Sequence, residues 1–130
     1  MGQAEAESHL NVAKKQLDRV QTASWDPDDN DREDAVTWGF YAYENAVVAV
    51  AEKENIPWKT THWNKLDIAE EIHIRGLVSV NVRKRLEELN ELRKDVQYGE
   101  PGPDLRDYDL ENLATELEAF LDEVEALVEP

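Results

Sequence analysis

Positively charged side chains gather in one short part of this otherwise acidic chain. Lysine and arginine number 14 against 30 aspartates and glutamates, which gives a net charge of −16. Five of the 14 lie close together: Arg83, Lys84, Arg85, Arg93 and Lys94. Guanidinium and ammonium groups clustered in this way can bind the phosphates of RNA or of a nucleotide. The alternative is that they form ion pairs with nearby carboxylates such as Glu87 and Glu88.

A carboxylate and an imidazole also have a spacing that metal sites use. Glu70 and His73 are three residues apart, so on a helix both would point toward the same ion. A di-iron bundle needs this pair twice with two further carboxylates, and the sequence has no second Glu-x-x-His, although Glu44 could join. Cysteine is absent, which excludes thiolate ligands, disulfides and cysteine nucleophiles. The sequence therefore predicts neither a metal nor another cofactor.

Other familiar signals for catalysis or for targeting are missing from the sequence. The chain has only five glycines and no Gly-rich phosphate loop, and no Ser-His-acid order can be recognised. No run approaches the roughly 18 apolar residues that span a bilayer, and the N-terminus lacks a secretory pattern. We therefore expect a cytoplasmic protein without a membrane segment. The simplest interpretation of the acidic excess is a solvated surface.

Apolar residues recur every three or four positions along most of the chain, which is the period of an amphipathic helix. The pattern predicts a single domain (1–130), all-α, folded as an antiparallel up-and-down bundle of about five helices. The expected helices cover about 4–22, 30–53 and 62–75, a fourth that starts at a cap on Ser79 or Asn81 and ends near Gly99, and a fifth from Asp107 or Asp109 to about Leu127. The second should be central, because it is apolar nearly all round, and the fifth should present an acidic outer face.

Caps and tryptophans give more local expectations. Asn30 followed by Glu33 resembles a capping box, with Asp31 as a competing cap, and Thr60 or Thr61 should cap the third helix. Trp25 and Trp58 fall in expected loops, where they would seal the ends of the bundle or mark a contact surface. Trp63 is expected to face inward.

Three segments of the chain resemble HEPN-domain proteins. Residues 89–99 (LNELRKDVQYG) resemble the signature helix of that family, residues 41–46 (YAYENA) resemble its central helix, and Thr61-His62 with the helix after it resembles the following element. Together the segments cover roughly residues 35–128. The resemblance implies a small helical bundle that usually dimerises and acts as an RNA-cleaving toxin, a nucleotide-binding domain or the partner of a minimal nucleotidyltransferase.

The resemblance also singles out Arg93 and Tyr98. In ribonuclease members an arginine precedes a histidine by four to six residues; the arginine stabilises phosphate charge and the histidine assists attack by the ribose 2′-hydroxyl. Arg93 stands at the arginine position, but the window after it contains Gln97, Tyr98 and Gly99 and no histidine. A phenol is a poor general base at neutral pH, although it can hydrogen-bond a phosphate. Binding is therefore expected more than cleavage.

These observations lead to three hypotheses. The first is a HEPN-like module, homodimeric through the fourth helix, that binds RNA or a nucleotidyltransferase-type protein partner and is catalytically weak or inactive. The second is a metal-independent ribonuclease of the kind found in toxin-antitoxin pairs, using Arg93 with Tyr98. The third is an acidic protein-protein interaction module. A structural alternative remains open for Arg93, which could form a buried polar cluster with Glu44 and Asp95.

Overall fold

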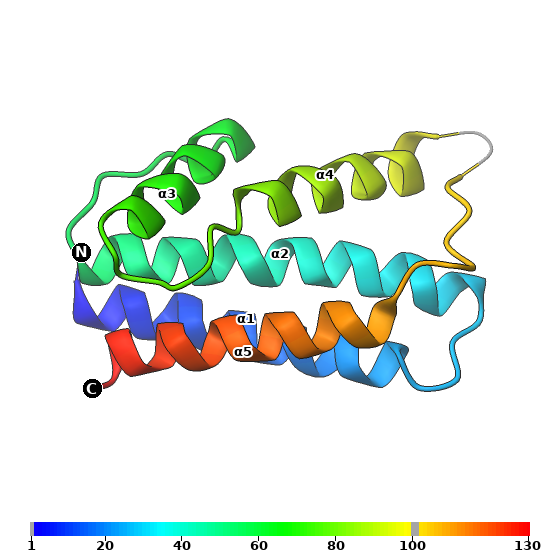
Figure 1. The fold of residues 1–130 in the computed structure, drawn as a ribbon, viewed down its shortest axis with the longest axis horizontal. Helices are drawn as coiled ribbons and strands as arrows, with labels where there is room; N and C mark the ends of the chain where they lie inside the picture. The colour runs from blue at the N-terminus through cyan, green and yellow to red at the C-terminus, as the bar shows by residue number, and fades with distance from the viewer. Residues whose placement is uncertain (1, 100–101) are drawn as a thin grey trace.

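The computed structural model describes residues 2–99 and 102–130 and contains five helices, with no strand in those residues (Figure 1). The helices are α1 (Gln3–Ala23), α2 (Asp29–Lys53), α3 (His62–Ile74), α4 (Arg83–Tyr98) and α5 (Leu110–Val128). The all-α helical bundle predicted from the apolar periodicity is therefore confirmed. None of the helices in the described residues is both long and apolar enough to cross a bilayer.

Helix α2 is the centre of the bundle and packs against all four other helices. Its buried side chains point in every direction around the helix axis, and include Val36, Phe40, Ala46 and Val50. A helix that is apolar all round must be surrounded, because each exposed apolar face would cost free energy in water. The position of α2 thus follows directly from its composition.

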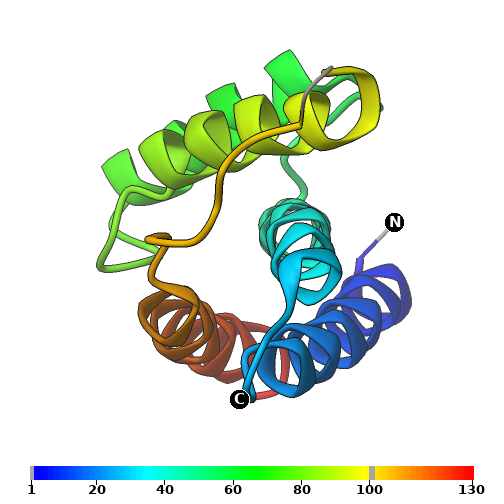
Figure 2. The same cartoon turned by 90° about the vertical axis from the view of Figure 1, so that its right-hand side faces the viewer.

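The other helices form two layers around α2. Helices α1 and α5 pack together on one side of it, and α3 and α4 lie on the other (Figures 1 and 2). The long helices alternate in direction, so that α1 and α4 run one way and α2 and α5 the other, while the short α3 lies obliquely beside α4 (Figure 1). No Cα atoms of α4 and α5 come within 8 Å of each other in the described residues. The two layers are therefore open toward each other along one side.

The helix starts agree with the expected caps in two cases and differ in two. Thr61 and Asp109 accept the backbone N–H groups of Asn64 and Asn112, as predicted. Helix α4 starts after Val82 with no side-chain cap of the usual kind, although Asn81 accepts the N–H of Arg83.

The expected capping box at Asn30 is wrong. Asp28 is the N-cap of α2: its carboxylate accepts the N–H of Asp31 at 2.8 Å, and the Asp31 carboxylate accepts the N–H of Asp28 at 3.1 Å. The capping box of α2 is therefore an Asp-x-x-Asp pair directly after Pro27, in place of the expected Asn30–Glu33 pair. The helix consequently begins earlier than predicted.

The tryptophans also depart from expectation. Trp25 is 85% exposed and seals nothing, and Trp63 is 74% exposed, so its predicted inward position is wrong. Trp58 is half-buried, donates its indole N–H to Glu52 at 2.7 Å and packs its ring against His9. Of the two loop tryptophans, only Trp58 therefore closes an end of the bundle.

The position of the α2 cap can be tested by mutation. We expect Asp28→Ala to lower the free energy of unfolding by about 1 kcal/mol, because the carboxylate that accepts the N–H of Asp31 at the helix start is lost. Asn30→Ala, inside the first turn, is the matched control and should change the free energy by less than half as much. Urea denaturation of both variants measures the difference, and an equal loss in the two would place the cap elsewhere.

Candidate functional site

Arg93 is a buried cation that has no carboxylate partner in the part of the chain that the structure describes. Helix α4 turns this side chain toward α2, where it is only 6% exposed and its guanidinium carbon lies 5.0 Å from the centre of the Phe40 ring. Its two terminal nitrogens donate to neutral amides, to Gln97 Oε1 at 2.7 Å and to Asn90 Oδ1 at 2.8 Å. Its Nε is buried and has no partner in the described residues. The positive charge is therefore solvated by amides and a ring but not neutralised.

The buried polar cluster considered for Arg93 does not form. Glu44 is buried on α2, but its partners are His62 and Lys65 of α3. Asp95 is exposed on α4, where its backbone carbonyl accepts the N–H of Gly99. Because Asp95 is two residues from Arg93, it points to a different side of the helix. The structure thus separates the three residues.

His62 is a functional candidate that the sequence motif did not reveal. It is the first residue of α3, and its Nδ1 donates to Glu44 Oε2 over 2.6 Å when that carboxylate is ionised. Lys65 Nζ lies 3.7 Å from the other carboxylate oxygen. The imidazole packs edge-on against Phe40, with ring centres 5.1 Å apart. His62 and Arg93 therefore contact the same aromatic ring, and a buried carboxylate orients the imidazole.

A cavity of about 220 Å³ lies between α3 and α4 beside His62. We call this cavity and its lining residues the α3–α4 site. The lining residues are His62, Trp63, Leu66, Glu87, Asn90, Glu91 and Lys94. Asn90 uses its carbonyl oxygen for Arg93, so its NH₂ group remains available to donate. Lys94 Nζ lies 3.5 Å from Glu91 at the surface. The site combines an oriented imidazole, an amide donor and an ammonium group, which together could bind a phosphate and move a proton.

The five clustered cations do not form one open basic surface. Arg83 bonds Asp67, Glu70 and Glu87 at 3.1 to 3.3 Å and so ties α4 to α3. Lys84 is exposed with no partner in the part of the chain that the structure describes, and Lys94 lines the α3–α4 site. Ion pairing, the alternative considered for these residues, accounts for Arg83, for Arg85 and for Lys94, which pairs with Glu91 at 3.5 Å. Of the five, Lys94 lines the α3–α4 site, and Arg93 lies behind it, bonded to the lining residue Asn90.

Arg85 belongs to a separate network on the other side of α4. Its guanidinium pairs with Glu116 of α5, and the same group lies 3.3 Å from the hydroxyl of Tyr108, which donates to Glu88 at 2.6 Å. Burial raises the pKa of Tyr43, which lies beside Arg85, to about 12. Burial and the bond to Glu88 raise the pKa of Tyr108 as well.

Tyr98, Glu70 and His73 lie apart from the site. Tyr98 is the last residue of α4, is 79% exposed and makes no side-chain hydrogen bond in the described residues. The Glu70 carboxylate accepts a hydrogen bond from Arg83, and His73 Nδ1 lies 3.4 Å from the Val78 carbonyl oxygen. Within residues 2–99 and 102–130, no group of three potential ligands is placed to hold a metal ion.

The raised pKa of Tyr43 predicts how stability depends on pH. The phenol holds its proton more tightly in the folded state, at a pKa of about 12 against 10 unfolded, so the stabilisation is complete below pH 10 and is lost as pH rises toward 12. The free energy of unfolding should therefore fall between pH 10 and pH 12. We expect this fall to be smaller by roughly 2 kcal/mol in Tyr43→Phe, which has no phenol to titrate. Tyr98→Phe, at an exposed position, is the control and should leave the pH dependence unchanged.

Comparison with known proteins found no matching protein-family model, no matching curated protein and no matching solved structure. The resemblance to HEPN domains therefore rests on the sequence segments around Tyr41, His62 and Arg93. In the structure these segments lie on α2, α3 and α4, the helices that build the α3–α4 site.

Proposed function

We propose that this chain is a HEPN-like module that binds RNA, with one backbone phosphate held at the α3–α4 site beside Arg93, and that it acts as a homodimer. The observation that carries the proposal is the charge of Arg93, which is 6% exposed and, among residues 2–99 and 102–130, hydrogen-bonds amides and no carboxylate. A buried ion without a counterion is costly, and a bound anion would remove that cost. Phosphate is the anion that an arginine fork fits best together with a nearby ammonium and amide donor.

An exposed aromatic side chain at the site supports RNA as the phosphate-bearing ligand. Trp63 lines the cavity and is 74% exposed, and a second exposed ring, Tyr98, lies outside the site at the end of α4. Bases of single-stranded RNA stack on such rings, and each stacked base contributes about 1–3 kcal/mol. Because the chain carries a net charge of −16, few phosphates can be held, and stacking must supply much of the affinity.

The homodimer and a nucleotidyltransferase-type partner come from the family resemblance, and one surface feature supports a protein contact there. Trp63 and Ile74, at opposite ends of α3, are 74% and 75% exposed. Tryptophan is among the residue types enriched in protein interfaces. Helix α3 is also the shortest helix and packs only on α2 and α4, which leaves its outer face open.

RNA binding at the α3–α4 site can be measured with a fluorescently labelled single-stranded RNA. We expect Asn90→Ala and Lys94→Glu each to weaken binding about tenfold, because each removes one donor that faces the phosphate. Arg93→Lys keeps the charge but loses the fork and should weaken binding to a similar degree.

The control is Lys15→Glu, the same charge reversal at an exposed position on α1, in the opposite layer of the bundle. It should leave the affinity within about twofold. Equal weakening by Lys15→Glu and Lys94→Glu would show that the affinity reflects overall charge and not the site. Absence of RNA binding by the unmodified protein would end the proposal.

A ribonuclease activity is the second candidate, and the His62–Glu44 pair favours it. In this reaction His62 Nε2, which has no partner in the described residues, takes the proton of a ribose 2′-hydroxyl. The 2′-oxygen attacks the adjacent phosphorus, the bond to the 5′-oxygen breaks, and the leaving oxygen takes a proton from water. The products are a 2′,3′-cyclic phosphate and a 5′-hydroxyl, and Arg93 with Asn90 would stabilise the phosphorane charge.

This second candidate predicts a division between binding and cleavage. With a metal chelator present, His62→Ala and Glu44→Gln should slow cleavage by about 10² to 10⁴-fold while RNA affinity stays nearly unchanged. His73→Ala and Tyr98→Phe are controls and should cleave at the unmodified rate. If the unmodified protein binds RNA but never cleaves it, the ribonuclease is excluded and the binding function stands.

A further inference from the structure

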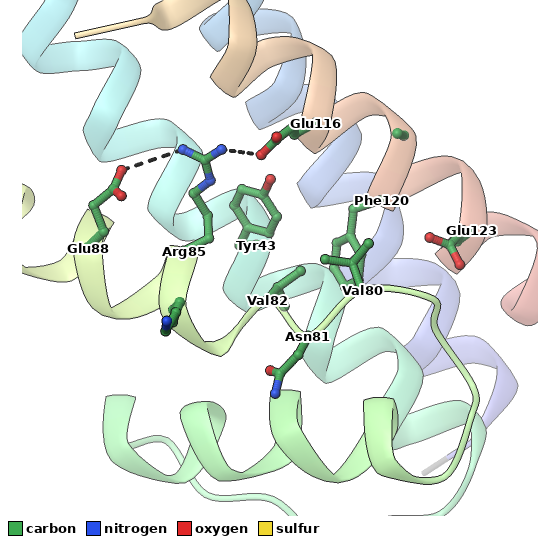
Figure 3. A pocket seen from close by; sticks show the side chains of 11 residues that line it. Tyr43, Val80, Asn81, Val82, Arg85, Glu88, Glu116, Phe120 and Glu123 are labelled. Atoms are coloured by element: carbon green, nitrogen blue, oxygen red, sulfur yellow. Dashed lines mark hydrogen bonds and ion pairs between the residues drawn. The ribbon is translucent and has the colours of Figure 1, made fainter.

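Glu44 differs from the other ion-paired carboxylates of the bundle in being buried. Its side chain is 6% exposed, whereas every other carboxylate that pairs with a cation, in the part of the chain that the structure describes, is at least 42% exposed. Arg85 shows the commoner case, because its partners Glu88 and Glu116 keep about half of their side-chain surface in water (Figure 3). A charge that water does not reach must be neutralised by a neighbouring group.

Two side chains of α3 reach Glu44, although one positive charge is enough to neutralise it. His62 Nδ1 lies 2.6 Å from one carboxylate oxygen, and Lys65 Nζ lies 3.7 Å from the other. An amine holds its proton far more tightly than an imidazole does. The ammonium group of Lys65 is therefore the counterion of Glu44, and the imidazole is not needed for that purpose. A neutral imidazole still donates one hydrogen bond to the carboxylate.

Lys65 is held in place by its surroundings. Its side chain is 15% exposed, the lowest value for an ion-paired cation among the described residues. Its ammonium group also donates to the carbonyl oxygen of Thr60 at 3.4 Å and lies 6.0 Å from the centre of the Trp58 ring. Both of these partners belong to the connection between α2 and α3. A carboxylate, a carbonyl and an aromatic ring thus fix the ammonium beside Glu44.

Other charged groups near the imidazole do not replace Lys65 in this role. The charged residues that face His62 from the helices around it are Glu44 from α2, Lys65 from α3, and Glu87, Glu91, Arg93 and Lys94 from α4. On α4, Glu87 pairs with Arg83 and Glu91 pairs with Lys94, so each carboxylate there has its own cation. Arg93 bonds amides of its own helix, which leaves Glu44 to its two partners on α3.

We propose that Lys65 is a positioning residue of the α3–α4 site, which neutralises Glu44 and so leaves His62 uncharged, with Nδ1 donating to the carboxylate and Nε2 free to accept a proton. A protonated ring would donate to a phosphate but could not take the proton of a ribose 2′-hydroxyl. Lys65 therefore decides whether His62 serves as a base. The use of that base rests on the ribonuclease proposed above, whereas the charge of the ring is a property of the protein without RNA.

The charge of His62 is measured by an NMR titration of its ring protons in the protein without RNA. We expect Lys65→Met to raise the midpoint of this titration by about one pH unit, because the ring then becomes the counterion of Glu44. Lys65→Gln, which keeps a polar side chain, should give the same shift, and Lys65→Arg should restore the original midpoint. Glu44→Gln should lower the midpoint by about one unit. Lys59→Met, at an exposed position of the α2–α3 connection, is the matched control and should change nothing.

Opposite shifts in the lysine and glutamate variants are the result that a merely structural role would not give, since local unfolding would move both midpoints toward that of a free imidazole. An unchanged midpoint in Lys65→Met and Lys65→Gln would overturn the proposal. In a protein that cleaves RNA, the rising limb of the pH–rate profile of Lys65→Met should move to higher pH by the same amount, so that a roughly tenfold loss at low pH is recovered as pH rises. An equal loss at every pH would also overturn the proposal. A protein that binds RNA but never cleaves it ends the ribonuclease candidate, and the NMR shift alone then decides the role of Lys65.

Discussion

The constraint on which the fold depends is the burial of α2 on all sides. A helix of 25 residues of which fourteen are buried cannot lie on a surface, so α1 and α5 must cover one side of it and α3 and α4 the other. Each covering helix has its own apolar stripe, and α5 has the most regular one. The bundle is therefore arranged so that four amphipathic helices enclose a fifth that is apolar nearly all round.

The same burial explains why the candidate sites lie where they do. The polar groups of α2 need partners from the covering helices, since an unpaired buried polar group is costly. Glu44 is hydrogen-bonded to His62 of α3, and Glu52 accepts the indole N–H of Trp58. Phe40 contacts both His62 and Arg93, while Tyr43, three residues further on, lies beside Arg85. Neighbouring residues of α2 thus lie against Arg93 on one face of α4 and against Arg85 on another.

The sequence predicted the helices well because apolar periodicity is a local signal, and it predicted the sites only in part because they depend on distant pairs. Thr61 and Asp109 were recognisable as caps, whereas Asp28 was missed because Asn30 and Glu33 fit the usual capping pattern better. The family resemblance pointed to Arg93, but nothing local joins Glu44 to His62, which is 18 residues away. A glutamate within the apolar pattern of α2 was the available signal, since a buried carboxylate requires a cation or hydrogen-bond donor nearby.

The contrast among three arginines of α4 is the main argument for the proposed role of Arg93. Arg83 and Arg85 both bond carboxylates from neighbouring helices and act as cross-links of the bundle. In a chain with 30 acidic residues, an arginine that served only to dock α4 on α2 would readily meet one as well. Arg93 instead bonds two amides that its own helix supplies, and an aromatic ring from α2. Neutral partners fix the position of the guanidinium without cancelling its charge, which is the arrangement that a site for an external anion requires.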